Sequence, residues 1–86
     1  MQSWFKFYPY RWLGRTRGLS LRAQGLYFEL LALWGDNQTV RDDVREIAQL
    51  IEISDYRAVR KALAELKKHG TIRTDHSGVL FDAYVQ

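Results

Sequence analysis

The stretch of sequence that decides the fold is YRAVRKALAELKKH, residues 56–69. At about 100° per residue, its side chains fall on two faces of one helix. The apolar face holds Val59, Ala62, Leu63 and Leu66. The opposite arc, about 120° wide, presents cations around one small residue: Arg57, Arg60, Lys61, Ala64, Lys67 and Lys68. The spacing therefore predicts a helix with one packed face and one basic face.

The residues in front of this helix predict a second, shorter one. Asp42 or Asp43 is placed to cap a helix that Ile53 and Ser54 interrupt, and Ser54 is the expected N-cap of the basic helix. Gly70 suits the left-handed conformation that closes such a helix. Two helices joined by so short a turn are typical of a helix-turn-helix.

Two short strands are expected after the basic helix. Residues 71–74 and 79–84 are predicted to pair around the turn sequence DHSG, residues 75–78. The C-terminal end of the chain should therefore form a β-hairpin, with Arg73 in its first strand and His76 at its tip.

A longer helix is expected nearer the N-terminus. Ser20 is its candidate N-cap, and Gly35 is placed to end it after Trp34. One face carries Ala23, Leu26, Tyr27, Leu30, Leu33 and Trp34, and a second face carries Leu21, Phe28 and Leu31. A helix that is apolar on two faces needs cover on two sides.

The aromatic segment WFKFYPYRWL, residues 4–13, is the expected second cover. Pro9 should exclude a helix through its centre and hold Tyr8 in an extended conformation. The same aromatic side chains could instead stack on single-stranded nucleic acid. The uncovered face of the long helix favours a place in the core.

Together these elements predict an α+β domain of the winged helix-turn-helix class, in one unit over residues 1–86. The expected architecture is three helices, a C-terminal two-stranded wing and an aromatic N-terminal arm. A chain of 86 residues is short for two domains. Because 47% of its residues are hydrophobic, the chain is also too apolar for a disordered segment.

Composition excludes several classes of protein. The chain has no cysteine, so disulfides, thiolate catalysis and cysteine-based zinc sites are excluded. No apolar run approaches the roughly 20 residues of a membrane span, and the N-terminus does not read as a signal peptide, so a cytoplasmic protein is expected. No enzyme activity, metal or cofactor is expected, because His69, Asp75 and His76 match no metal-ligand spacing.

Charge is distributed unevenly along the chain, although the net charge is only +3. Residues 1–22 hold five bases and no acid, residues 23–56 hold two bases and seven acids, and residues 57–73 hold six bases and one acid. A clustered basic face favours nucleic-acid binding more than the total charge does. Double-stranded DNA is therefore the expected partner.

The helix over residues 56–69 is the candidate recognition helix. Arg and Lys side chains neutralise phosphates and donate to guanine edges, and the small Ala64 would let the helix approach a groove closely. Arg73 of the hairpin and the loop residues Arg15 and Arg17 are further candidate contacts. A basic stripe is often only a solvated face, but its place as the second helix of a helix-turn-helix favours DNA contact.

The N-terminal third of the chain also carries a family resemblance. The run FYPYRWLGRTRGLSLRAQGLY, residues 7–27, is similar to the start of the YdaU-like domain family (domain of unknown function DUF1376) of phage and prophage replication proteins. Its members share an aromatic–proline arm, a Thr-Arg-x-Leu-Ser segment, here residues 16–20, and a Gly-x-Tyr-x-x-Leu-Leu helix, here residues 25–31. The resemblance implies a winged-helix module of a replication initiation protein, with replication proteins such as a helicase or its loader as partners.

Two other functions stay open at this point. The acidic middle of the chain could make the domain a protein-interaction module of a replisome or helicase-loading assembly. The same fold also serves transcriptional regulators, which differ in the DNA site that they bind. The basic helix favours DNA binding over the first of these, and the resemblance favours replication over the second.

Overall fold

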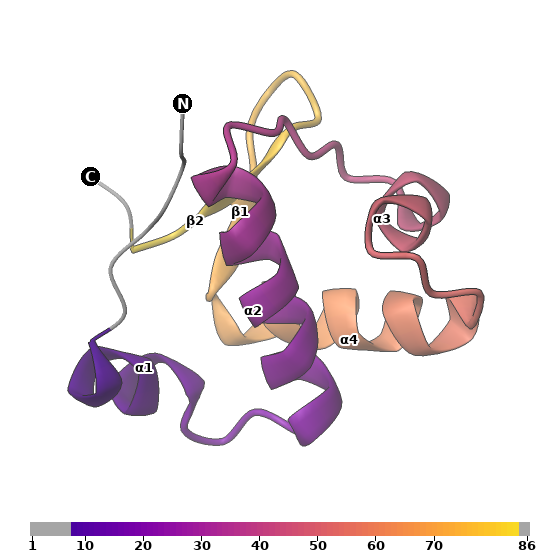
Figure 1. The fold of residues 1–86 in the computed structure, drawn as a ribbon. Helices are drawn as coiled ribbons and strands as arrows, with labels where there is room; N and C mark the ends of the chain where they lie inside the picture. Colours follow the sequence, from indigo (N-terminus) through magenta and orange to yellow (C-terminus); the bar gives the residue numbers. More distant parts are fainter. Residues whose placement is uncertain (1–7, 85–86) are drawn as a thin grey trace.

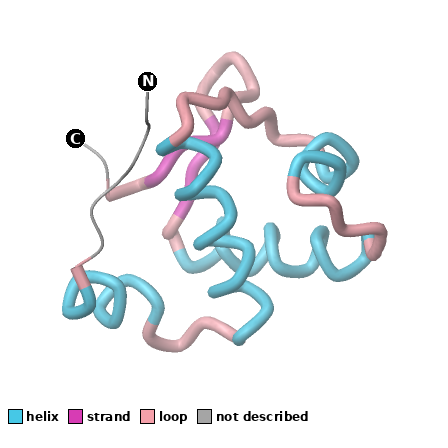
Figure 2. Tube along the Cα trace, in the orientation of Figure 1, coloured by secondary structure: helices cyan, strands magenta, loops and turns pink. Residues whose placement is uncertain are grey.

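The computed structural model describes residues 8–84, which form four helices and one two-stranded antiparallel sheet (Figure 1). The architecture is therefore α+β, as the sequence predicts. In chain order the elements are α1 (Pro9–Thr16), α2 (Leu21–Gly35), α3 (Val44–Leu50), α4 (Tyr56–His69), β1 (Ile72–Thr74) and β2 (Leu80–Asp82). Helix α2 runs through the middle, with α1 on one side, α3 on the other and α4 crossing it (Figures 1 and 2).

The long central helix α2 begins where its sequence predicts, and the first of its two predicted apolar faces is the one that is buried, whereas Leu21 and Phe28 of the second face are exposed. The Ser20 side chain caps it by accepting a hydrogen bond from the Ala23 amide, 3.1 Å away. Its buried residues are Ala23, Leu26, Tyr27 and Leu30. They pack against α4, whose buried residues are those of the predicted apolar face: Val59, Ala62, Leu63 and Leu66.

The short helix α3 and the start of α4 form two helices with a tight turn between them. Asp43 caps α3, because its carboxylate accepts from the amides of Arg45 and Glu46. The expected Ser54 cap of α4 is wrong by one residue. Asp55 takes that place and accepts from the Ala58 amide at 3.1 Å, so α4 begins at Tyr56.

The C-terminal hairpin has shorter strands than the sequence predicts. Strands β1 and β2 pair antiparallel with Arg73 opposite Phe81. The segment before α3 also joins this sheet, since Arg41 forms an isolated antiparallel bridge with Val79. The Leu80 amide donates to the Val40 carbonyl at 2.8 Å beside that bridge. The segment between α2 and α3 is therefore tied to the hairpin, which the sequence analysis missed.

The predicted extended arm is wrong from Pro9 onward. Pro9 does not interrupt a helix there but begins α1, with Tyr8 extended in front of it at φ −115° and ψ 107°. The first residue of a helix needs no amide hydrogen, and the fixed φ of proline suits that position. The chain thus has four helices within residues 8–84 where three were expected, and Arg15 lies in a helix rather than in a loop.

The expected packing of the arm on α2 holds for Trp12. Its ring stacks on Tyr27 with centroids 5.5 Å apart and an interplanar angle of 10°, and meets Phe28 edge-on at 5.8 Å. Tyr10, in contrast, is 68% exposed, and Leu21, which the arm was expected to cover, is 86% exposed. Three further aromatic residues of the predicted arm lie outside the described residues: Trp4, Phe5 and Phe7.

If α1 is part of the core through its tryptophan, Trp12→Ala should lower the free energy of unfolding by about 2–3 kcal/mol, somewhat less than for a fully buried aromatic. Tyr10→Ala is the control on the same helix and should change it by less than about 0.5 kcal/mol. Urea unfolding followed by circular dichroism measures both. Equal values for the two variants would contradict the packing role of α1.

Candidate nucleic-acid interface

The outer face of α4 carries the predicted cations in exposed positions. Ala64 lies in the middle of this face and is exposed as well. Among residues 8–84, no side-chain hydrogen bond or ion pair engages four of the five cations, which are Arg57, Arg60, Lys61 and Lys68. We call these four side chains with Ala64 the cationic face. Its charges are available to a ligand without the loss of an internal contact.

The fifth cation, Lys67, is held by the protein itself. Its Nζ donates to Oδ2 of Asp42 at 2.5 Å, and the Thr74 hydroxyl donates to the same oxygen at 2.9 Å. Burial acts to raise the pKa of Asp42, but the hydrogen bonds from Lys67 and Thr74 outweigh it and lower that pKa. This cluster links α4 to β1 and to the segment before α3, and it withdraws one predicted contact from the surface.

The two arginines of the predicted basic loop lie in different places. Arg15 turns inward: its Nη1 lies 3.6 Å from Oδ2 of Asp82, and its guanidinium lies 4.7 Å from the centroid of the Tyr84 ring. Arg17 is exposed in the turn after α1. Arg15 therefore has a partner within the protein, whereas Arg17 is available to a ligand.

The turn that carries Arg17 lies against the C-terminal end of α4. His69 Nε2 contacts the Arg17 carbonyl at 3.0 Å, and His69 Nδ1 contacts the Thr71 hydroxyl at 2.9 Å. Because a carbonyl can only accept, we assign the ring proton to Nε2 and the acceptor role to Nδ1. His69 therefore fixes this turn beside α4.

The single acid within α4, Glu65, points toward α2 and not toward the cationic face. Its carboxylate accepts from the Ser20 amide at 2.6 Å and from the Ser20 hydroxyl at 2.8 Å. These two hydrogen bonds, followed by the nearby charge of Arg22, lower the pKa of Glu65. The Glu65 carboxylate therefore binds at the N-terminus of α2 and does not reduce the positive charge of the cationic face.

The hairpin adds one exposed cation, Arg73, in β1. Its loop is held by Asp75, whose Oδ1 accepts from the amides of Ser77 at 2.8 Å and Val79 at 3.0 Å. Hydrogen bonds from these amides lower the pKa of Asp75. Asp75 therefore has a structural role, and His76 lies exposed at the tip.

Sequence reasoning missed three roles at this surface. It did not pair Lys67 with Asp42, did not direct Glu65 to Ser20, and did not bring Arg22 near α4. The partners in the first two pairs are 25 and 45 positions apart. Rules based on local spacing cannot connect residues so far apart in the sequence. The only signal in the sequence is the presence of acids that a recognition surface would have to neutralise.

Other kinds of site receive no support from residues 8–84. Within them, no three His, Asp or Glu side chains come together as a group that could hold a metal ion. No helix in this part of the chain is both long enough and apolar enough to cross a membrane.

Comparison with known proteins adds no assignment. The chain matches no protein-family model, and no curated protein or solved structure is significantly similar to it. The resemblance of residues 7–27 to phage replication proteins therefore stays a prediction.

The Asp42 cluster gives a testable pH dependence. Since folding lowers the pKa of Asp42, its contribution is present above its ordinary pKa and is lost as the pH falls through the lower folded value. Asp42→Asn should reduce the free energy of unfolding at pH 7 by about 0.5–1.5 kcal/mol. The deficit should shrink below about pH 4. Urea unfolding at several pH values measures it.

Asp36→Asn is the matched control, because the Asp36 side chain is exposed and has no hydrogen bond or ion pair among the described residues. It should change stability by less than about 0.5 kcal/mol. An Asp42→Asn deficit that is the same at pH 7 and at pH 3 would rule out the ionised cluster as its cause.

Proposed function

We propose that this chain is a winged-helix DNA-binding domain that grips duplex DNA with α4 and the hairpin. The observation that carries the proposal is the cationic face: four cations that have no partner among residues 8–84 surround one alanine on the side of α4 that faces away from the core. Cations of this kind supply the phosphate neutralisation on which affinity for DNA depends.

The order of the elements supports the winged-helix assignment. Helices α3 and α4 with their tight turn correspond to a helix-turn-helix, and the following hairpin corresponds to a wing. The isolated bridge between Arg41 and Val79 joins the segment before α3 to the hairpin. The contacts of Asp42 with Lys67 and Thr74 link the same segment and β1 to α4, which supports a hairpin held at the end of that helix.

The positions along α4 divide the proposed contacts into two kinds. Recognition helices place their N-terminal residues at base edges, so Arg57, Arg60 and Lys61 are the proposed groove contacts. Ala64 follows them and lets the helix backbone come close to the DNA. Lys68, in the last turn, would contact phosphate, as would two flanking cations, Arg73 of β1 and Arg17 of the turn before α2.

Two of the residues that the sequence singled out take a smaller part in this proposal. Lys67 is paired with Asp42 and Arg15 with Asp82, so each would have to give up an ion pair to bind a phosphate. We therefore assign them to the framework of the domain.

Replication initiation in a phage or mobile element is the proposed biological role, and the cytoplasm the proposed location. This part rests on the resemblance of residues 7–27 alone. The partners would be double-stranded DNA and replication proteins such as a helicase or its loader. A protein-interaction module or a transcriptional regulator is the alternative, and each has its own outcome in the tests below.

Charge reversal on the cationic face should abolish duplex binding without unfolding the domain. Arg57→Glu together with Arg60→Glu places two anions where the phosphates would lie, and neither side chain is buried. The matched control reverses Arg41 and Arg45, which are also exposed but lie in the acidic segment. Binding to random duplex at low salt, measured by fluorescence anisotropy, should fall at least tenfold more for the first pair.

Equal losses of affinity for the two double variants would show that binding depends only on the overall charge of the domain. No duplex binding by the unaltered domain at low salt would assign it to protein interaction. Selection of binding sites from genomic DNA then separates a replication origin from a transcriptional operator.

The salt dependence of binding counts the phosphates that are neutralised. At about −0.9 for each phosphate contact, the slope of log affinity against log salt should be about −3 if only Lys68, Arg73 and Arg17 contact phosphate, and about −5 if the three groove cations neutralise phosphates as well. Lys68→Gln should flatten the slope by about 0.9, whereas Lys67→Gln should change it little. Arg17→Gln should likewise flatten the slope by about 0.9, whereas Arg15→Gln should change it little.

These two pairs are matched because each joins a free cation to an ion-paired one nearby in the sequence. Equal slopes for Lys67→Gln and Lys68→Gln would show that Asp42 releases Lys67 on binding. An unchanged slope for Arg17→Gln would place the turn before α2 off the DNA.

A further inference from the structure

Helix α1 carries an exposed cluster of two tyrosines and one arginine that the proposed duplex contacts do not use. Tyr10 is 68% exposed, and Tyr8 and Arg11 are exposed as well. The Arg11 guanidinium lies 4.6 Å from the centroid of the Tyr8 ring and 5.8 Å from that of the Tyr10 ring. The centroids of the two rings are 6.2 Å apart, with an interplanar angle of 61°. We call these three side chains the tyrosine–arginine cluster.

The aromatic residues of α1 lie in two different environments. Trp12 packs on Tyr27 and Phe28, so it supplies the cover that α2 needs. Tyr10 and Trp12 are two residues apart in the helix and therefore point to nearly opposite sides, about 200° apart. Cover of the core accounts for Trp12 and leaves the exposed ring of Tyr10 without a structural role.

Gly14 leaves open space beside Tyr10, one turn later in the same helix. Residues four apart lie on the same face, and helical side chains lean toward the N-terminus. A side chain at position 14 would therefore lean over the turn that carries Tyr10. Gly14 is exposed, and a Cβ atom placed on it would meet no atom within 4 Å. Glycine is a poor residue for a helix interior, and no contact among the described residues requires it here.

The surroundings of the tyrosine–arginine cluster are positively charged. Residues 8–22 hold four arginines and no acid. Glu65 and Asp82 contact this segment from elsewhere in the chain, but each is already engaged with it in a hydrogen bond or an ion pair. Among residues 8–84, no acid forms an ion pair with Arg11. An anionic ligand would therefore meet a cation that the protein has not neutralised.

The combination of rings and cations indicates the class of ligand. Proteins bind single-stranded nucleic acid by stacking its bases on aromatic side chains while cations follow its phosphates. A ring can stack only on a base whose face is open, and inside a duplex the neighbouring base pairs cover both faces of each base. A ligand that uses both Tyr10 and Arg11 therefore has unpaired bases as well as phosphates.

We propose that α1 is a second nucleic-acid site, at which an unpaired base of a single strand stacks on Tyr10 beside Gly14 while Arg11 contacts the adjoining phosphate. Tyr8 holds the Arg11 guanidinium through its cation–π contact and leaves the N–H groups free to donate. Arg17, in the turn that follows α1, lies beside the end of α4, so the new site adjoins the proposed duplex contacts. It does not depend on them, because no residue of the cationic face takes part.

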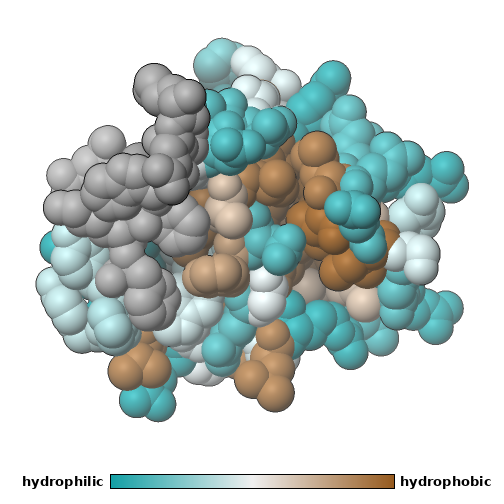
Figure 3. Space-filling model, viewed as in Figure 1, coloured by the Kyte–Doolittle hydropathy of each residue, from teal (hydrophilic) through white to brown (hydrophobic). Residues whose placement is uncertain are grey.

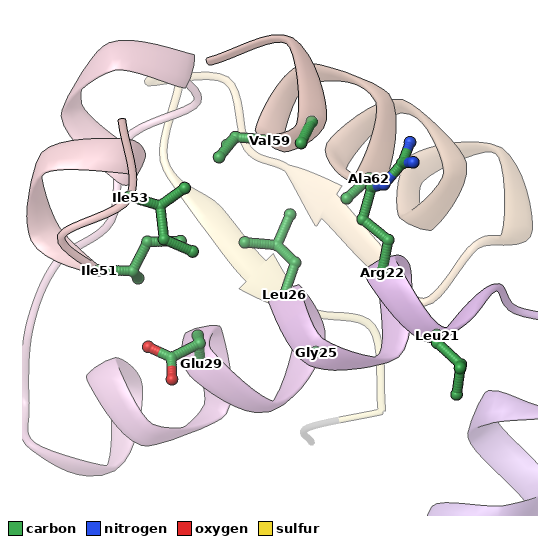
Figure 4. Close-up of a pocket in the computed structure, with 10 residues that line it drawn as sticks. Leu21, Arg22, Gly25, Leu26, Glu29, Ile51, Ile53, Val59 and Ala62 are labelled. Atoms are coloured by element: carbon green, nitrogen blue, oxygen red, sulfur yellow. The ribbon is translucent and has the colours of Figure 1, made fainter. Parts of the chain in front are cut away.

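The apolar groove beside α2 is a separate surface, which lies between α2, the α3–α4 turn and the first half of α4. Its volume is about 370 Å³. Figure 3 shows hydrophobic surface in this region, between α2 and α3, and Figure 4 labels residues that line the groove. The described residues of its lining include no aromatic side chain, so a base would find no ring to stack on there. Gly25, which lines it, serves as a control below.

The test measures the affinity of the domain for a fluorescently labelled oligothymidylate of about 12 nucleotides, by anisotropy at low salt. Tyr10→Ala should weaken this binding at least fivefold, because the stacking of one base on an aromatic side chain is lost. The substitution should leave the fold intact, since Tyr10 is exposed. Tyr10→Phe keeps the ring and should bind within about twofold of the unaltered domain. Neither change should alter the affinity for duplex.

The two charge-reversal variants separate this site from the cationic face. Reversal of Arg57 and Arg60 should weaken single-strand binding no more than reversal of Arg41 and Arg45 does, since both change the net charge equally. A larger loss for the α4 pair would place the single strand on the cationic face and overturn the proposal. No binding of oligothymidylate by the unaltered domain, or full affinity in Tyr10→Ala, would also overturn it. Neither result would affect the proposed duplex binding, and a failure of duplex binding would not affect this site.

Gly14→Leu is the second variant. The leucine would lie over the turn that carries Tyr10 and should weaken single-strand binding at least fivefold. It should also raise the melting temperature, because leucine is the better helix former. Gly25→Leu is the matched control, since Gly25 is likewise an exposed helical glycine with no atom within 4 Å of an added Cβ, and it should leave the affinity unchanged. Equal affinity of the two variants would place the bound base away from Tyr10 and overturn the proposal.

Discussion

The rest of the structure depends on a buried carboxylate at the end of β2. Asp82 is 3% exposed, and it is satisfied by three elements at once: the Tyr27 hydroxyl of α2 donates at 3.0 Å, Arg15 of α1 lies at 3.6 Å, and the Tyr84 amide donates from beyond the strand. Burial and then the charge of Asp82 raise the pKa of Tyr27, which keeps its hydroxyl protonated as a donor. A charge buried without partners would cost several kcal/mol, so Tyr27 of α2 and Arg15 of α1 both stabilise the hairpin where it packs on α2.

Internal partners for acids also determine how charge is distributed over the surface of the domain. Among the other acids that are engaged inside the protein, Asp42 binds Lys67 and Thr74, Glu65 binds Ser20, and Asp75 binds the amides of its own loop. Each uses its negative charge to fix a turn, a cap or a strand instead of presenting it on the cationic face. The cationic face therefore arises as much from where the acids are bound as from where the bases lie. A count of bases along the chain would overstate the number of cations available at this surface, because it includes Arg15 and Lys67.

The parts of the fold that the sequence predicts are those that local rules govern. The buried and exposed faces of α4 follow from its periodicity, and the Ser20, Asp43 and Gly70 caps follow from side-chain chemistry within one helical turn. Local rules gave wrong predictions where one sequence feature is compatible with two different structures. Proline either breaks a helix or begins one, and Pro9 begins α1. Leu21 was assigned to the core because apolar residues usually need cover, whereas its 86% exposure depends on the place of α1, which the sequence does not reveal.

Different sides of helix α4 face the core, the groove beside α2, and the solvent at the cationic face. Its alanines make these three arrangements possible. Ala62 packs in the core and lines the groove, Ala58 lines the groove, and Ala64 lies in the middle of the cationic face. Small side chains on that face would let the proposed DNA duplex approach the helix backbone closely. Alanine also has the highest helix propensity, so it favours the helical conformation of α4 on the sides where no other element packs. If α4 is the recognition helix, as proposed, DNA binding would not have to induce it.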